Sequence, residues 1–317
     1  MFHVNHYGLY FTPAVRLDLR AVADQGYIQR AWEALEAKFS DPQTPDIDRA
    51  LAGALLEKLT DQPLHTEQVA SAFQQTARSP LPDHMLEAVG SLQTRIHMLE
   101  LVRDNPAISS ESWGHYADDL AAQVDDLIRT SDSQDYVTLL SLDTLKLLAG
   151  LALERERWFE EGKTAFTRAI EGQLRPQGFI QPAVEADRLS PFSAIERQIL
   201  ATRSLVLMAQ AASASANLDL WNHKVRGVSV ATAAMYPIYY FYTTAKWSWD
   251  EALAPEIVQE AFKRNGGWLE MAQQRLQHKD MALVLDDVRP IWDASGGGMT
   301  TLTHGWPPKP KRRGWFG

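Results

Sequence analysis

The sequence of 317 residues contains no cysteine. This absence excludes disulfide bonds, thiol nucleophiles, and zinc or iron–sulfur sites built on cysteine ligands. Histidines also lack a metal-binding arrangement, because His3 and His6 have no third ligand and no HExxH spacing beside them. We therefore expect a solvated terminal pair at these histidines, and neither a bound metal nor a cofactor.

Positive charge is scarce outside the last residues of the chain. The formal net charge is -9 at pH 7, whereas a face that binds nucleic acid needs clustered lysines and arginines. The composition therefore argues against a nucleic-acid partner. We expect the proline-rich tail at 305–317 to be solvated. It holds the one basic cluster, which consists of Lys309, Lys311, Arg312 and Arg313.

The sequence also lacks the marks of export and of membrane insertion. Its first residues have no basic start and no apolar core of a signal peptide. No run of about 18 apolar residues suggests a membrane span. As written, the sequence predicts a cytoplasmic protein, and a periplasmic or secreted location is expected instead if an export signal has been removed.

Helical patterns recur along the chain, with few strand patterns between them. The hydrophobic content of 45% is sufficient for a large core. The segment 136–159 is apolar nearly all round, which is typical of an inner helix. Apolar residues at helical spacing, often after Pro, Ser or Asp, predict helices over residues 12–22, 27–39, 47–59, 66–77, 82–103, 110–129, 136–159, 161–173, 191–216, 228–242 and 255–277.

The number of helices and the short connections between them indicate the architecture. About ten helices in succession favour antiparallel hairpins arranged as an array or a closed ring. We predict an all-α protein, an incomplete (α/α) toroid or barrel that forms a single domain over residues 1–317. The alternative is an open solenoid, but no repeat of about 34 to 47 residues supports it.

Three segments of the chain carry a family resemblance. They are GLYFTP at 8–13, the stretch 170–185 followed by Arg188, and RPIWD at 289–293 with a glycine run at 296–298. In order and spacing they resemble the helical domain shared by alginate lyases and heparinase-type polysaccharide lyases. The resemblance implies an (α/α)-toroid fold. It also implies an acidic, uronic-acid-containing polysaccharide or oligosaccharide as partner, and cleavage by β-elimination.

The sequence departs from this family pattern at two places. Family members open the long inner helix with Asn-Asn-His, whereas this chain has SQDYVT at 133–138, without histidine. A catalytic tyrosine follows the arginine-bearing loop in the family, and Phe192 stands near that position here. These departures keep a second hypothesis open, in which the protein is a non-catalytic descendant that binds carbohydrate or a protein partner.

β-Elimination needs a group that neutralises the uronate carboxylate, a base for the C5 proton and an acid for the departing oxygen. Arg188 is the predicted neutralising residue, because a guanidinium pairs bidentately with a carboxylate. Gln181 is predicted to add a hydrogen bond to the substrate. An equal alternative is that Arg188 pairs with Glu185 or Asp187 within its own loop.

Tyrosines are the predicted bases, and tryptophans the predicted stacking residues. Tyr136 and Tyr239 are the candidates for proton abstraction, although aromatic residues at helical spacing more often pack in a core. Trp247 is predicted to stack on a sugar ring, with Trp249 beside it. Both tryptophans equally fit a role in plugging the end of the barrel.

Carboxylates offer a further enzymatic hypothesis. Asp135 and Glu185 are predicted to bind substrate, and as a pair they would suit glycoside hydrolysis, which needs two carboxyl groups. The glycine run at 296–298 has no following lysine and no preceding strand, so it is not a phosphate-binding loop. We expect a flexible turn there, and we expect His115 to make surface hydrogen bonds only.

Overall fold

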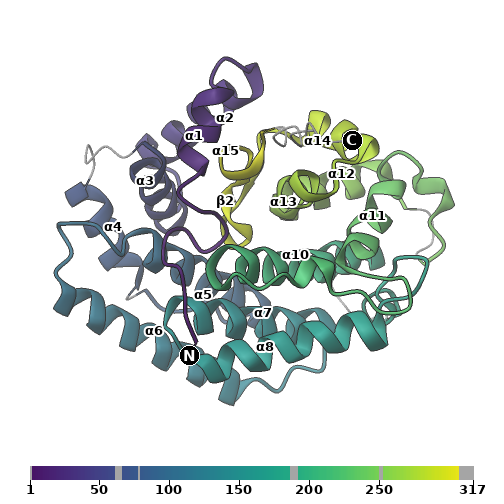
Figure 1. Ribbon diagram of the computed structural model, residues 1–317, viewed down its shortest axis with the longest axis horizontal. Helices are drawn as coiled ribbons and strands as arrows, with labels where there is room; N and C mark the ends of the chain where they lie inside the picture. Colours follow the sequence, from purple (N-terminus) through teal and green to yellow (C-terminus); the bar gives the residue numbers. More distant parts are fainter. Residues whose placement is uncertain (1, 61–65, 78, 186–191, 250–252, 307–317) are drawn as a thin grey trace, which may run out of the picture.

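The computed structural model describes residues 2–60, 66–77, 79–185, 192–249 and 253–306, and most of these residues are helical (Figure 1). The α-helices are α1 (Val15–Ala21), α2 (Gly26–Ser40), α3 (Asp46–Thr60), α4 (Thr66–Ala77), α5 (Met85–Leu101), α6 (Ser110–Thr130), α7 (Tyr136–Ala152), α8 (Glu156–Arg168), α9 (Gln181–Val184), α10 (Ala194–Ala216), α11 (Val230–Phe241), α12 (Pro255–Asn265), α13 (Gly267–Leu276), α14 (Lys279–Val288) and α15 (Thr300–His304). The remaining elements are the π-helix η1 (Ala169–Gln173), the 3-10 helices η2 (Leu220–Asn222), η3 (Thr244–Lys246) and η4 (Ala294–Gly296), and the strands β1 (Trp292–Asp293) and β2 (Gly298–Met299).

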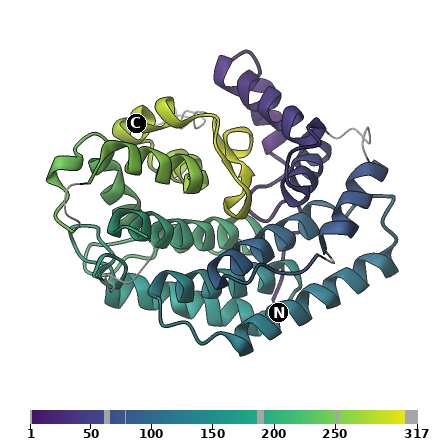
Figure 2. The same cartoon turned by 180° about the vertical axis from the view of Figure 1, so that it is seen from behind.

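The helices form an incomplete (α/α) toroid, as the sequence predicts. Helices α3, α5, α7, α10 and α13 follow one another around the inside, while α4, α6 and α8 return the chain on the outside. Figures 1 and 2 show the C-terminal segment from α13 to α15 lying between the N-terminal helices and α11. This segment brings the two ends of the helical array together, because α15 packs on both α13 and α2.

The difference between inner and outer helices follows from their sequences. The inner helix α7 is buried on most of its faces, whereas the outer helix α6 buries one stripe through Tyr116, Leu120 and Val124. Polar side chains cap the N-terminal ends of several helices. Asp135 caps α7, and Ser193 begins α10 with a capping box completed by Glu196. The inner helices therefore start at defined residues, and their first turns are held in place.

Two predicted helices are each divided in the structure. The segment 136–159 breaks between α7 and α8, where Glu154 takes a left-handed φ of 53°. Gly150 allows the tight return, since a Cβ there would lie 2.4 Å from the backbone nitrogen of Phe159. The segment 255–277 breaks at Gly266 between α12 and α13. Both single-helix predictions were therefore wrong, because a local backbone break interrupts a continuous helical pattern.

The glycine run forms a tight, buried turn rather than the flexible turn expected. Strands β1 and β2 pair antiparallel, with Trp292 opposite Met299 and Asp293 opposite Gly298. Gly297 has a φ of 107°, which favours glycine. A Cβ at Gly296 would lie 2.1 Å from Asp293 Oδ2, so no side chain fits there. The turn therefore fixes the carboxylate of Asp293.

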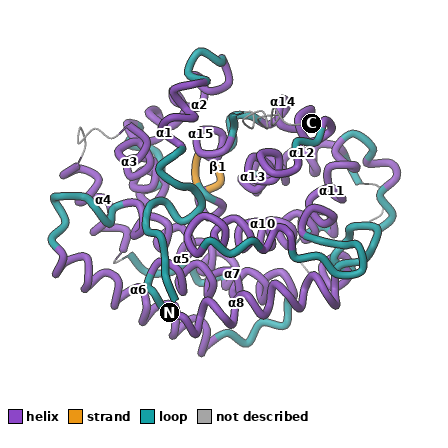
Figure 3. Tube along the Cα trace, viewed as in Figure 1, coloured by secondary structure: helices purple, strands orange, loops and turns teal. Residues whose placement is uncertain are grey.

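The N-terminal arm, residues 2–14, crosses the C-terminal ends of the inner helices without forming a helix (Figure 3). The backbone nitrogen of Asn5 donates to the carbonyl of Ser215 at the end of α10, at 2.7 Å. Ser215 Oγ donates to the carbonyl of Leu9 at 3.0 Å. These bonds tie the arm to the end of α10.

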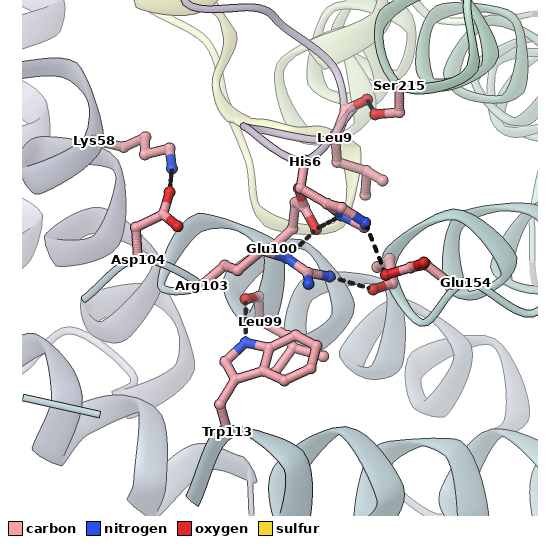
Figure 4. Close-up of polar contacts among 11 residues, drawn as sticks. His6, Leu9, Lys58, Leu99, Glu100, Arg103, Asp104, Trp113, Glu154 and Ser215 are labelled. Atoms are coloured by element: carbon pink, nitrogen blue, oxygen red, sulfur yellow. Dashed lines mark hydrogen bonds and ion pairs between the residues drawn. The ribbon is translucent and has the colours of Figure 1, made fainter. Parts of the chain in front are cut away.

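An ionic network holds the same arm to α5 and α7 (Figure 4). His6 Nδ1 lies 3.0 Å from Glu100 Oε2, and His6 Nε2 lies 3.2 Å from Glu154 Oε1. Arg103 Nη2 donates to the carbonyl of Ala152 at 2.7 Å, and its Nε lies 3.4 Å from Glu100 Oε2. The expectation of a solvated terminal histidine pair was therefore wrong for His6, which is an anchor of the arm.

One helix among the described residues, α10, is long and apolar enough to cross a membrane by length and composition alone. The sequence did not predict such a run. Most of the apolar window of α10, 83% of it, is buried inside the protein. This burial is what a helix at the centre of the ring requires.

Candidate functional site

A cavity of about 460 Å³ lies at the end of the ring opposite the N-terminal arm. We call it the central cavity. Its walls come from the starts of α3 and α5, the first half of α7 and α10, the end of α12, and η4. It is lined by Ile47, Pro82, His84, Leu86, Glu87, Val89, Gly90, Ser91, Gln93, Thr94, Ser141, Phe192, Leu200, Arg203, Arg264, Asn265, Ala294 and Ser295.

The N-terminal ends of several inner helices face this cavity. Ile47 lies in the first turn of α3, Leu86 in the first turn of α5, Phe192 just before the cap of α10, and Asn265 just before α13. Each helix start carries partial positive charge from backbone N–H groups that have no partner within the helix, and a helix start typically favours an anion by about 0.3–1 kcal/mol. The arrangement of the helices therefore favours a negatively charged ligand in the cavity.

Exposed polar side chains at the cavity supply possible reactive and binding groups. His84 is exposed, and it precedes α5 without making a side-chain capping bond. Arg264 is 59% exposed, and its Nη2 lies 3.7 Å from Glu260 Oε1. Asn265 follows it at the end of α12. A histidine, an accessible guanidinium and an amide therefore line one cavity, which is enough to bind a carboxylate and move a proton.

A buried ion pair forms another part of the cavity wall. Arg203 Nε and Nη2 donate to the two carboxylate oxygens of Asp293 at 2.9 and 3.0 Å. Arg203 Nη2 also donates to Ser295 Oγ at 2.6 Å. Because its charge is matched by Asp293, Arg203 serves mainly to attach the β1–β2 hairpin to α10. Nearby, Gln93 Nε2 donates to the carbonyl of Ser141 at 3.0 Å and joins α5 to α7.

The predicted arginine loop is only partly described, since Arg188 lies outside the described residues. Gln181 and Glu185 lie at the short helix α9, in a segment that falls between the predicted helices 161–173 and 191–216. Gln181 accepts a hydrogen bond from Arg175 and donates to Glu185 Oε2, the latter at 2.7 Å. Neither residue lines the central cavity. Their binding roles remain predictions.

Tyr136 and Asp135 stand at the start of α7 and are engaged in local bonds. Tyr136 OH donates to Gln173 Oε1 at 2.6 Å. Burial raises the pKa of the Tyr136 phenol, which opposes its use as a base. Asp135 accepts from the backbone nitrogen and the hydroxyl of Thr138, both at 2.8 Å. The carboxylate of Asp135 thus caps the helix, and neither residue lines the central cavity.

Tyr239 and Trp247 belong to an aromatic cluster beside α11. The Tyr239 ring is 51% exposed, and its hydroxyl accepts a hydrogen bond from Lys246 Nζ at 2.8 Å. Trp247 is buried, with its ring centroid 4.8 Å from that of Tyr240. The prediction that Trp247 offers a sugar-stacking face is not supported, because the surrounding rings cover it. Trp249 Nε1 donates to Tyr236 OH at 3.0 Å.

The polar groups that line the cavity are not among the residues predicted from the sequence. His84 stands at the start of the predicted helix 82–103, a position where a side chain projects from the first turn. Arg264 and Asn265 precede the glycine pair at 266–267, which is a helix-break pattern inside the predicted helix 255–277. Attention to helix starts and breaks would have found all three. Phe192, which stands near the family's tyrosine position, does line the cavity.

Comparison with known proteins gives no match at the level of sequence. No family model matches this chain, and no curated protein matches it. Solved structures do match. An alginate lyase from Bacteroides ovatus aligns with a TM-score of 0.68 at 11% identity, over 94% of this chain and 98% of that one.

Alginate lyase A1-III is a second structural neighbour. The enzyme from Sphingomonas species A1 aligns with a TM-score of 0.65 at 15% identity, over 83% of this chain and 76% of that one. A variant of A1-III complexed with a tetrasaccharide aligns with a TM-score of 0.67 at 15% identity, covering 84% and 78% of the two chains. These likenesses show that this chain has an alginate-lyase-like fold, and identities this low show the fold alone.

Proposed function

We propose that this protein is a polysaccharide lyase that binds an acidic, uronic-acid-containing polysaccharide in the central cavity and cleaves it by β-elimination. The observation that carries the proposal is the position of His84 and Arg264 on the wall of a cavity that faces the starts of several inner helices. The fold likeness to alginate lyases, one of them complexed with a tetrasaccharide, supports the substrate class.

Arg264 is the proposed neutralising residue for the C6 carboxylate. Its ion pair with Glu260 is long, at 3.7 Å, and solvent-screened, so an incoming carboxylate can replace it. A guanidinium binds a carboxylate through two parallel hydrogen bonds, and Asn265 adds an amide donor beside it. Withdrawing electron density from the carboxylate makes the C5 proton easier to remove.

His84 is the proposed base. Its imidazole takes the proton from C5, the C5–H electron pair forms the C4=C5 double bond, and the bond from C4 to the departing oxygen breaks. The imidazolium then returns the proton to that oxygen, so protons and electrons balance within one group. The exposure of His84 and its lack of a capping bond leave its ring nitrogens available for this step.

A second function has one specific observation in its favour. Among the described residues that line the central cavity there is no tyrosine, and Phe192 occupies a wall position. A protein that binds the polysaccharide without cleaving it would keep the cavity and its cations while lacking the phenol. Such a carbohydrate-binding toroid is the alternative that experiment has to separate from the lyase.

Ultraviolet absorbance of the unsaturated uronate product tests the proposal. Purified protein is mixed with alginate, polyglucuronate and heparin, and each variant is compared with a matched control. His84→Gln and Arg264→Gln should each abolish turnover, whereas His115→Gln and Arg129→Gln, which alter exposed residues of α6, should leave it unchanged.

The same experiment separates the two functions. If calorimetry shows that a polymer binds but no product forms, the result supports the non-catalytic toroid. In that case Phe192→Tyr, which adds a phenol to the cavity wall, is assayed for a gain of turnover. Turnover that survives both His84→Gln and Arg264→Gln contradicts our assignment of the site. Absence of both binding and turnover with all three polymers contradicts the proposed function itself.

A further inference from the structure

The proline-rich tail has no role in the fold or in the proposed function. Its residues 307–317, which we expected to be solvated, lie outside the described residues. This segment contains no acidic residue. Its charged and aromatic residues are Lys309, Lys311, Arg312, Arg313, Trp315 and Phe316. A segment of this composition matches a surface that offers both carboxylates and exposed apolar side chains.

The start of the tail is held beside the end of α14. Tyr27 OH donates to the carbonyl of Gly305 at 2.9 Å. The guanidinium carbon of Arg289, the residue that follows α14, lies 4.4 Å from the centroid of the Tyr27 ring. Two side chains therefore connect Gly305 to the end of α14. Residues 307–317 leave from a fixed point close to this helix.

One side of α14 faces solvent. The helix packs on α11, α12 and α13, and Figure 1 shows it at the outer edge of the ring. Its exposed residues include Asp280, Leu283, Asp286 and Asp287. We call these residues, together with Tyr242 at the end of α11, the α14 face. Tyr242 OH donates to Asp287 Oδ2 at 2.6 Å and lies 3.2 Å from the carbonyl oxygen of Leu283, so the face is continuous.

The α14 face combines apolar surface with carboxylates. Tyr242 and Leu283 are 58% and 55% exposed. No ion pair of Asp286 or Asp287 is found among the described residues. The nearby guanidinium of Arg289 donates to both oxygens of Glu270 at 2.7 Å. The carboxylates of the face are therefore available to other cations.

Other surfaces match the tail less well. Helix α1 also packs on α15, and its Leu17 is 67% exposed. Leu17 stands between Arg16 and Arg20 in the sequence, however, and like charges repel. Helix α6, which is described throughout, carries several aspartates but exposes no large apolar side chain. Of these surfaces, only the α14 face has both features.

The tail is long enough to follow α14. Residues 307–310 read Pro-Pro-Lys-Pro, a sequence that favours an extended conformation of about 3.1 Å per residue. Asp286 and Asp280 are six residues apart, which is about 9 Å along the helix axis. Residues 311–317 extend to about 23 Å. The charged and aromatic residues of the tail therefore span the whole face.

We propose that the proline-rich tail docks on the α14 face of its own chain. Its lysines and arginines pair with Asp286 and Asp287, and its aromatic rings cover Leu283 and Tyr242. Exposed ion pairs contribute little each, so the apolar contacts are needed as well. A short tether gives an effective concentration on the order of mM, and an intrinsic affinity in that range is sufficient for half occupancy. The proposal does not depend on the proposed lyase activity.

Disulfide cross-linking in the full chain tests this inference, because the chain has no cysteine of its own. Gly317→Cys, which keeps both tail aromatics, is combined with Leu283→Cys or with the matched control Ile257→Cys. Ile257 is 43% exposed, has Glu256 and Glu260 nearby, and belongs to α12, which packs on α14. With oxidised glutathione, the intramolecular disulfide should form at least about tenfold faster with Leu283→Cys.

Further variants separate docking from general attraction between charges. Tyr242→Ser removes a ring without changing the charge. Asp286→Asn combined with Asp287→Asn removes two charges and keeps an oxygen that can accept from Tyr242. Each should slow the reaction of Leu283→Cys by about threefold or more. Asp125→Asn combined with Asp126→Asn, on exposed positions of α6, is the charge-matched control and should leave the rate unchanged.

Three results would overturn the inference. The first is an equal rate with Leu283→Cys and Ile257→Cys. The second is a rate that neither Tyr242→Ser nor the asparagine pair changes. The third is a disulfide between two chains whose yield rises with protein concentration, since it would assign the α14 face to the tail of a second copy. Circular dichroism and thermal melting identify any variant that fails to fold.

Discussion

The two ends of the inner helices differ in how their polar groups are used. At the end covered by the N-terminal arm, His6, Glu100 and Arg103 bond to one another or to backbone. At the end with the central cavity, His84 makes no capping bond, and the one ion pair of Arg264 among the described residues is a long contact with Glu260. One end is closed by bonded groups, whereas the other presents groups to solvent. The difference separates residues that hold the ring from residues available for binding.

Acid should affect the covered end most. Burial lowers the pKa of His97 to about 3 and that of His304 to about 4, from an ordinary 6.5. Both residues pack around Tyr10 of the arm. Between about pH 6.5 and pH 4 these two histidines bind protons in the unfolded chain but stay neutral in the folded chain. The free energy of unfolding is therefore highest above about pH 6.5 and falls as the pH drops toward 4.

The size of this loss is about 1.4 kcal/mol for each unit by which a pKa is lowered. Denaturant unfolding at a series of pH values measures it. His97→Leu should flatten the dependence, whereas His115→Leu, at an exposed position, should leave it as in the parent protein. A parent protein whose unfolding free energy is unchanged between pH 7 and pH 4 would contradict the prediction.

Breaking the ion pair beside the central cavity should be the next largest effect. Asp293→Ala leaves the guanidinium of Arg203, which is 6% exposed, without its carboxylate. Removing one partner of a buried pair typically costs about 3–5 kcal/mol. Equilibrium urea unfolding gives the value, and Asp280→Ala on the exposed start of α14 is the control. A loss below about 1 kcal/mol would mean that the hairpin does not depend on this pair.

Loosening the arm should have a smaller effect that stays local. His6→Ala removes contacts to Glu100 and Glu154, and we expect a loss of about 1–2 kcal/mol. Amide exchange of Asn5 should accelerate, while amides of α5 near Gly90 should keep their protection. His3→Ala is the control. Equal acceleration at both ends of α5 would show that the two ends are not energetically separate.

The smallest expected stability effect lies at the open end. His84→Gln removes an exposed side chain that makes no capping bond, so the free energy of unfolding should change by less than about 0.5 kcal/mol. Its turnover should nevertheless be lost. Thermal melting and the product assay on the same preparation test whether stability is kept while turnover is lost. A variant that is destabilised but still active would contradict the prediction.

Much of the fold was predictable from the sequence, because helix formation depends on local patterns. The helical succession, the buried character of α7 and the toroid arrangement were predicted and confirmed. The breaks at Glu154 and Gly266 were not, since each arises from one backbone position inside a continuous apolar pattern. Helix α14 and the β1–β2 hairpin were missed as well, because short elements carry weak periodicity.

The candidate site was harder to predict, because it depends on which helix starts meet in space. His84 and Arg264 are 180 positions apart in the sequence, yet both line the central cavity. Tyr136 was chosen for its place at the start of α7, but its hydroxyl bonds to Gln173. Local sequence predicts that a residue lies at the start of a helix. It does not predict whether the side chain of that residue faces a cavity or a neighbouring helix.

The most direct test of the central claim is calorimetric titration of a uronate tetrasaccharide into the parent protein, Arg264→Gln and the control Arg129→Gln. We predict saturable binding to the parent and the control, and binding at least about tenfold weaker to Arg264→Gln, because the carboxylate loses its bidentate partner. Equal affinity of all three proteins would contradict the claim that the central cavity holds the acidic sugar.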